Sequence, residues 1–205
     1  MEHNTIANII LLIIIIVIVI TVTIAFLSNK CSEIPDTMLT FNDIKHMMKT
    51  GDIILLNGAK YIRSNIIRAV TNSPITHSLM IIRDGNELNA IDISPFRTKD
   101  VKIRPLKDIF NEDLHPTQCW IPYDADINIT NEDIQRYKQI NYNYSPMKLY
   151  NSSESNMICP AFVAYIHKDK GFNPGGLSDT SRWWAKSIKD YYHDNRTIHF
   201  NIIRS

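Results

Sequence analysis

The sequence predicts an α+β domain built on a largely antiparallel sheet, preceded by one N-terminal transmembrane helix. Apolar runs of strand length follow one another between residues 52 and 121, and segments of helical period flank them. Asp84-Gly85, a strong hairpin signal, joins two of these runs and indicates antiparallel pairing. Behind an uncharged apolar opening, the 205-residue chain has room for one domain of ordinary size.

Residues 6–27 are almost unbroken Ile, Val and Leu and carry no charge. At about 1.5 Å per residue, a helix of this length spans roughly the hydrocarbon thickness of a bilayer. The run is too long for the apolar region within a signal peptide, no basic region precedes it, and no small-residue cleavage site follows it. We therefore expect residues 1–30 to form a retained single-pass anchor. Lys30 follows the segment, so the positive-inside rule favours a cytosolic C-terminal domain.

Residues 31–49 are predicted to form a polar linker and a short helix, and residues 50–205 the folded domain. The helix begins at Thr40-Phe-Asn-Asp43, which resembles a capping box. The segment 141–156, rich in Tyr, Asn and Ser, is expected to be an ordered loop. Within the domain we predict strands at 52–56, 76–82, 87–93, 101–103, 118–121 and 197–204, and helices at 60–71, 105–110, 130–141, 159–170 and 179–192.

Composition excludes some classes of function. Hydrophobic residues make up 44% and charged residues 21%, and the formal charge of +1 offers no electrostatic basis for a nucleic-acid partner. Cys31, Cys119 and Cys159 are an odd number of cysteines, which argues against a disulfide framework. A zinc site built from Cys119, Cys159 and histidines would lack paired ligand spacing, and we predict neither a metal nor a cofactor. Abundant Ile and Asn suit an AT-rich genome.

Cys159 stands immediately before Pro160, and proline is favoured in the first turn of a helix. Phe162, Val163 and Ile166 then follow at helical spacing, so Cys159 is expected at the N-terminal end of a buried helix. The helix macrodipole at that end favours a thiolate over a thiol. The alternative is a small core cysteine at a helix start, because free cysteines are mostly buried and inert.

A base and a group that orients it would complete a nucleophilic site. His77 is expected to open one strand of the predicted hairpin, and Asp92 lies on the return strand. Side chains opposite each other across antiparallel strands lie about 5 Å apart, so one face can hold both. The three residues would then follow the logic of a Cys-His-polar triad. Alternatively, His77 is a hydrogen-bonded strand histidine and Asp92 a turn aspartate. Five further histidines are predicted to be surface residues, namely His46, His115, His167, His193 and His199.

Three segments resemble the permuted NlpC/P60 (papain-like) superfamily, and most closely its YiiX/YebB-like branch. They are Thr50-Gly-Asp-Ile-Ile54, Ile66-Ile-Arg-Ala-Val-Thr-Asn-Ser73 and Thr76-His-Ser-Leu-Met-Ile-Ile82. Lecithin-retinol-acyltransferase-like enzymes and a poxvirus protein are more distant relatives. The resemblance covers about residues 50–166 and implies a circularly permuted papain-like fold. In this family the histidine precedes the cysteine in the chain.

The resemblance implies that His77 is the catalytic histidine and Cys159 the nucleophile. Asp92 is our choice for the third polar residue, and Asn89 is its rival, because the spacing of the family fits both. Asp52 matches a Gly-Asp turn that we interpret as structural. The chain departs from the family pattern after Cys159, where the usual Ser and Glu are missing, and threonine replaces serine before the histidine. These departures leave the class of substrate open.

Together these features predict a membrane-anchored cysteine hydrolase or acyltransferase. It would act on an amide, ester or thioester bond of a peptide or lipid acyl substrate, through an acyl-enzyme at Cys159. The expected partner is the lipid bilayer of a host or a virion, as in a protein of a large DNA virus. The alternative is a catalytically silent structural or virion membrane protein that uses the same fold.

Overall fold

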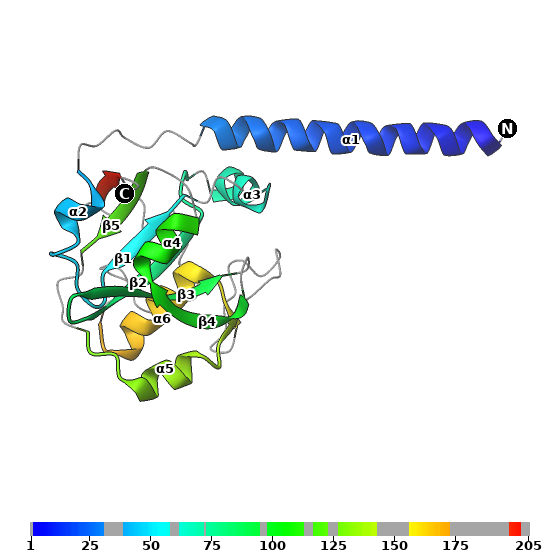
Figure 1. The fold of residues 1–205 in the computed structure, drawn as a ribbon. Helices are drawn as coiled ribbons and strands as arrows, with labels where there is room; N and C mark the ends of the chain where they lie inside the picture. Colours follow the sequence, from blue (N-terminus) through cyan, green and yellow to red (C-terminus); the bar gives the residue numbers. More distant parts are fainter. Residues whose placement is uncertain are drawn as a thin grey trace.

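The computed structural model describes residues 2–30, 39–57, 62–71, 73–94, 98–112, 117–122, 127–142, 156–172 and 197–201 (Figure 1). The predicted helix at 179–192, which contains Trp183 and Trp184, lies outside these residues, as do Cys31, His115 and His193.

A six-stranded antiparallel sheet forms the centre of the domain, with the strand order β4-β3-β2-β1-β5-β8. The strands are β1 (Ile53–Leu56), β2 (His77–Asp84), β3 (Glu87–Ser94), β4 (Thr98–Pro105), β5 (Thr117–Ile121) and β8 (Ile198–Asn201). Two short strands, β6 (Asn141–Tyr142) and β7 (Asn156–Met157), extend the β4 edge and pair with each other in parallel. The predicted α+β class with an antiparallel sheet is therefore confirmed.

Six helices accompany the sheet in the described part of the chain: α1 (Glu2–Lys30), α2 (Phe41–Ile44), α3 (Ile62–Thr71), α4 (Leu106–Glu112), α5 (Asn131–Tyr137) and α6 (Cys159–Asp169). Several predicted elements differ in length from the observed ones, most clearly β4, α2 and α5, which ends at Tyr137 and not at the predicted residue 141. Strand β4 is longer than the predicted 101–103 because it pairs with β3 from Ser94 back to Asn89. Helix α2 is a single helical turn, and the residues that follow it, up to Thr50, form turns and not further helix.

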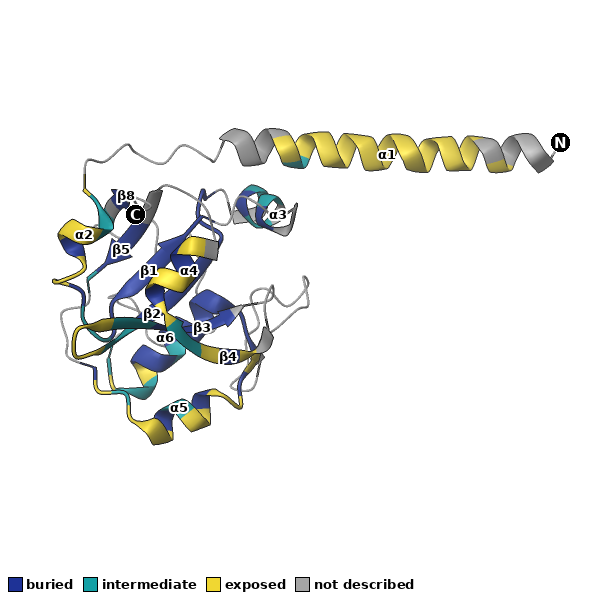
Figure 2. Ribbon diagram, in the orientation of Figure 1, coloured by how far each residue is buried: buried dark blue, intermediate teal, exposed yellow. Residues whose placement is uncertain are grey.

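Helices cover both faces of the sheet, so side chains that alternate along a strand enter two separate cores. The core under α6 contains Phe162 and Val163 packed with strand residues such as Met80. The core under α4 contains Leu106 and Phe110 packed with strand residues of opposite parity such as Leu79 and Ile81. All four residues of β1, an apolar run in the sequence, are buried (Figure 2).

The Gly51-Asp52 turn fastens the start of β1. Gly51 has φ +99°, a backbone conformation that favours glycine. The carboxylate of Asp52 is fully buried and accepts a hydrogen bond from the indole N–H of Trp120 at 2.8 Å. His167 was predicted to be a surface residue, but it is fully buried, and its Nε2 lies 2.9 Å from the carbonyl oxygen of Gly51. The surface prediction for His167 was therefore wrong, because the side of α6 that carries this residue faces the Gly51-Asp52 turn.

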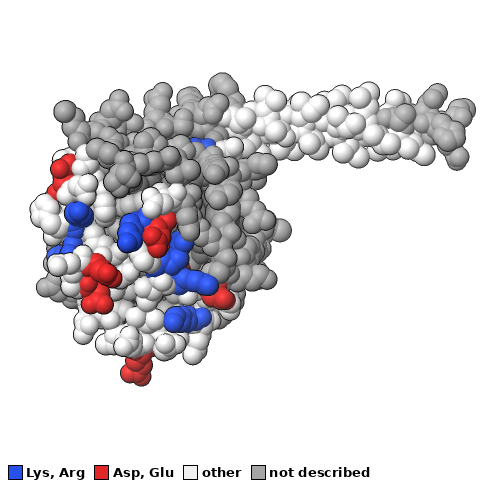
Figure 3. Space-filling model, viewed as in Figure 1, with Lys and Arg blue, Asp and Glu red and all other residues white. Residues whose placement is uncertain are grey.

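Helix α1 is long and apolar enough to cross a membrane. Its window Asn8–Ala25 has a mean hydropathy of 3.2, and none of that window is buried. The described side chains of α1 are almost all exposed (Figure 2) and uncharged (Figure 3). On the visible face of the domain, in contrast, basic and acidic side chains are interspersed (Figure 3). The apolar and polar surfaces of the chain are thus divided between α1 and the domain.

Candidate active site

His77 and Asp92 form a close buried pair. His77 is the first residue of β2, and the β2–β3 register, which pairs Met80 with Ile91, puts His77 and Asp92 on the same face. Nε2 of His77 lies 2.7 Å from Oδ1 of Asp92. The two residues are only 8% and 4% exposed, respectively. A carboxylate accepts hydrogen bonds, so Nε2 carries the proton and the ring is held through this nitrogen.

Cys159 is the first residue of α6 and is 4% exposed. The helix begins one residue earlier than the proline rule suggests, so Pro160 occupies its second position. The side chain of Cys159 interacts with His77 through a hydrogen bond and through charge. Because Asp92 occupies Nε2, the free nitrogen for this contact is Nδ1. The first residue of β2 and the first residue of α6 therefore lie next to each other.

The pKa of His77 is the net result of opposing effects. Burial alone would lower the pKa, but the negative charges of Asp92 and Cys159, and hydrogen bonds to both, raise it well above its ordinary value. His77 therefore favours the imidazolium form, which is the form that pairs with a thiolate.

Cys119, on β5, is a buried cysteine in a different setting. Burial raises the pKa of its thiol to about 12. It packs in the core under α6, and its thiol has little thiolate character at neutral pH.

Arg104, on β4, is a neighbour of Asp92 that sequence reasoning missed. Its Nη2 lies 3.5 Å from Oδ2 of Asp92, and its side chain is 20% exposed. Strand β4 pairs with β3 so that Asp92 lies opposite Lys102, with Arg104 two residues further along the same face. The alternating basic residues of β4 were visible in the sequence, but the β3–β4 register was not.

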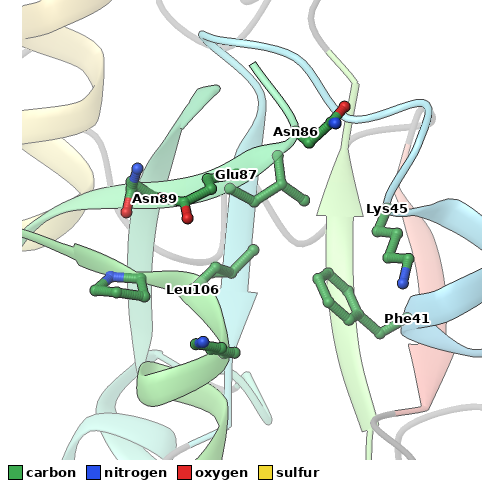
Figure 4. A pocket seen from close by; sticks show the side chains of 9 residues that line it. Phe41, Lys45, Asn86, Glu87, Asn89 and Leu106 are labelled. Atoms are coloured by element: carbon green, nitrogen blue, oxygen red, sulfur yellow. The ribbon is translucent and has the colours of Figure 1, made fainter. Parts of the chain in front are cut away.

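Asn89, the rival third residue, is not beside His77. Strand alternation puts it on the opposite face of β3 from Asp92. It lines a separate cavity of about 240 Å³ between the β2–β3 turn, α2 and α4 (Figure 4). Phe41, Leu88, Pro105 and Leu106 give this cavity apolar walls, and Lys45, Asn86, Glu87 and Lys107 give it a polar rim.

No protein-family model matches the chain, and no curated protein sequence matches it. In fold, the chain is similar to the metalloprotein yiiX from Escherichia coli O157:H7, with a TM-score of 0.50 and 15% sequence identity. The match covers 74% of this chain and 95% of that protein. The neighbour is thus the protein for which the YiiX/YebB-like branch is named, and the likeness is one of fold.

The yiiX neighbour is described as a metalloprotein. In this chain, the described residues contain no group of three or more His, Cys, Asp or Glu side chains placed to hold a metal ion. His77 and Asp92 are instead paired with each other at 2.7 Å, and His77 also interacts with Cys159, an arrangement that does not fit a metal ion.

Proposed function

We propose that this chain is a membrane-anchored thiol hydrolase or acyltransferase of papain-like fold, in which Cys159, His77 and Asp92 form the catalytic triad. The observation that carries the proposal is the position of the His77 imidazole between the Asp92 carboxylate and the thiol of Cys159. A buried histidine held in this way has one nitrogen for orientation and one for proton transfer. The yiiX-like fold supports the papain-like assignment.

In the proposed reaction, the Cys159 thiolate attacks the carbonyl carbon of an amide, ester or thioester. The new C–S bond gives a tetrahedral oxyanion, for which the backbone N–H of Cys159 at the helix start is the natural donor. The intermediate collapses with loss of the leaving group, which takes a proton from the His77 imidazolium. Water or an acceptor nucleophile then attacks the thioester, His77 takes up its proton, and the thiolate leaves.

The apolar helix α1 supports a bilayer as the place of action. Its window Asn8–Ala25 is exposed, uncharged and of membrane-spanning length. An anchored domain meets mainly lipids and membrane-proximal peptides, so we infer a peptide or lipid acyl substrate. Lys30 at the end of the helix favours the cytosolic side for the domain, on a host or virion membrane. The formal charge of +1 gives no electrostatic reason to propose a nucleic-acid partner.

The anchor is tested by the mass and the extraction behaviour of the full chain. A retained anchor gives a protein of about the full 23.7 kDa that stays with membranes through alkaline carbonate washing. A mature protein that lacks the first 30 or so residues, as after signal cleavage, would contradict the anchor without affecting the active site.

The nucleophile is tested by labelling with a thiol-reactive acyl probe. Wild-type protein should carry the label on Cys159 at neutral pH, as located by peptide mass spectrometry, and Cys159→Ala should lose this label. Cys119→Ala is the matched control, because it removes a buried thiol that does not contact His77, and labelling should persist. Undiminished labelling of Cys159→Ala would remove the nucleophile assignment. A Cys159 thiol that iodoacetamide alkylates no faster than free cysteine at neutral pH would favour the catalytically silent structural protein instead.

A further inference from the structure

Asp92 has a cation on each side of its carboxylate. Oδ1 accepts from His77 Nε2 at 2.7 Å, and Oδ2 lies 3.5 Å from Nη2 of Arg104. The Asp92 side chain is only 5% exposed, so solvent screens this charge poorly. The three residues lie on adjacent strands β2, β3 and β4, which fixes their order in space.

The three groups of the proposed triad do not balance in charge. A thiolate at Cys159, an imidazolium at His77 and a carboxylate at Asp92 together carry one net negative charge. Burying an uncompensated charge is costly, and each ion of a buried cluster needs a partner. The guanidinium of Arg104 is charged at every working pH and brings the total to zero.

We propose that Arg104 is a positioning residue that keeps the cluster of Cys159, His77 and Asp92 electrically neutral, so that thiolate and imidazolium coexist in a buried site. This inference rests on the function proposed above, and it assigns to that site a fourth member.

Neutrality would persist through the reaction. In the acyl-enzyme Cys159 is an uncharged thioester and His77 has given its proton to the leaving group. Asp92 and Arg104 then remain as a balanced pair. The charges of these four groups sum to zero in both stable states, so proton transfer by His77 requires no compensating charge movement among them.

The ionisable groups around Asp92 include His77 on β2, and Arg104 and Lys102 on β4, while Cys159 on α6 interacts with the far side of the cluster through His77. Lys102 lies opposite Asp92 in the register, but its side chain is exposed. Lys102→Gln therefore removes the same charge from the same strand without removing the contact at Oδ2, and it is the matched control for Arg104→Gln.

The first measurement is the titration of the His77 ring by NMR, in the full chain in detergent, with His77→Gln used to assign the signal. Loss of Arg104 removes a positive charge from beside Asp92 and His77, so the imidazolium should persist to higher pH. We expect Arg104→Gln to raise the midpoint by about one pH unit, given a nearby unit charge at an effective dielectric of about 20. Lys102→Gln should shift it by less than about a third of that, because exposed charges are screened.

The second measurement is the rate at which iodoacetamide alkylates Cys159 as a function of pH. A cluster with an excess negative charge disfavours the thiolate, so Arg104→Gln should slow alkylation at pH 7 by about tenfold, the equivalent of one pH unit. Arg104→Lys keeps the charge and should restore the rate to within about threefold of wild type. Arg104→Met keeps the apolar stem and serves as the neutral variant if the glutamine variant does not fold.

An unchanged His77 midpoint in the neutral Arg104 variants, or an equal shift in Lys102→Gln, would overturn the inference. The NMR titration does not require turnover. If wild-type Cys159 takes no acyl label but the midpoint moves as expected, the proposed function fails while the charge arrangement stands.

Discussion

The Oδ1 oxygen of Asp92 lies 2.7 Å from Nε2 of His77, although the two residues are 15 positions apart in the chain. The antiparallel β2–β3 hairpin brings them onto one face. A carboxylate that accepts from Nε2 fixes the tautomer and the orientation of the ring, so the other nitrogen faces Cys159. The activity, the pH dependence of stability and the reactivity of the thiols should all depend on this contact.

Asp92→Asn should slow turnover of an acyl substrate by about 10²-fold or more, within the range of general acid–base contributions. The amide can still hold the ring, but it no longer stabilises the imidazolium. The measurement is kcat/KM on an acyl substrate that the wild type turns over. Asn89→Ala is the control, because Asn89 lies on the other face of β3 and should change the rate by less than about twofold. A larger effect at Asn89 than at Asp92 would reverse the assignment of the third residue.

The stability of the fold should fall as pH rises above neutral. His77 has a pKa raised in the folded state, so its contribution is complete below its ordinary value of about 6.5 and is lost as pH rises through the raised folded value. Urea unfolding of the wild type between pH 6 and pH 10 should show this loss. Asp92→Asn should show a smaller loss over the same range, because the charge that raises the pKa is gone. Equal slopes would contradict the ion pair.

The two described cysteines should differ in reactivity. Cys159 contacts the imidazole of His77, whereas burial raises the pKa of Cys119 to about 12. We expect iodoacetamide at pH 7 to modify Cys159 at least about tenfold faster than Cys119 in the folded protein. Peptide mass spectrometry of the alkylated chain measures both sites. In urea the two rates should converge, and convergence in the folded state would argue against activation of Cys159.

The sequence predicted the strands and the helix that carry the candidate site, but not all of the contacts between them. The hairpin signal at Asp84-Gly85 and the alternation of side chains along β2 and β3 are local sequence patterns, so a face shared by His77 and Asp92 could be inferred from them. The choice between Asp92 and Asn89 needed the register, which the spacing alone left open. Arg104 was missed because its contact depends on how β4 pairs with β3.

The buried position of His167 was missed for a different reason. Charged residues follow it directly in the sequence, as expected near the exposed end of a helix. In the structure its ring reaches the carbonyl of Gly51, which is 116 residues away. This tertiary hydrogen bond gives Nε2 of the buried ring a partner, and no local sequence pattern predicts it.

Gly51→Ala should destabilise the domain by about 3 kcal/mol, the sum of backbone strain and overpacking. Gly51 has φ +99°, and an added Cβ would lie 2.6 Å from Cδ1 of the buried Ile127. Gly85→Ala is the matched control, because Gly85 has φ +56° but open space around it. It should cost about 1 kcal/mol of strain alone. Urea unfolding compares the two, and equal losses would show that contact with Ile127 is not limiting.

Asp133 links α5 to the end of α6. Its replacement should lower the free energy of unfolding at neutral pH but not at pH 2. It accepts from the backbone N–H of its cap residue Thr130 at 2.8 Å and pairs with Lys170. Burial opposes ionisation, but hydrogen bonds from Lys170 and Thr130 prevail and lower the pKa of Asp133 to about 2. The stabilisation is therefore present above the ordinary pKa of about 3.9 and is lost as pH falls through about 2.

Asp133→Asn should accordingly cost about 1 to 3 kcal/mol of unfolding free energy at pH 7 and little at pH 2, since a cap and a part-buried ion pair are lost together. Asp43→Asn is the control: Asp43 makes the same bond to the backbone N–H of Thr40 at 2.8 Å, but it is exposed and has no lysine partner in the described residues. Its loss should be smaller, as expected for an exposed cap. An equal effect of the two substitutions at pH 7 would mean that the cap, and not the pairing of Asp133 with Lys170, carries the stabilisation.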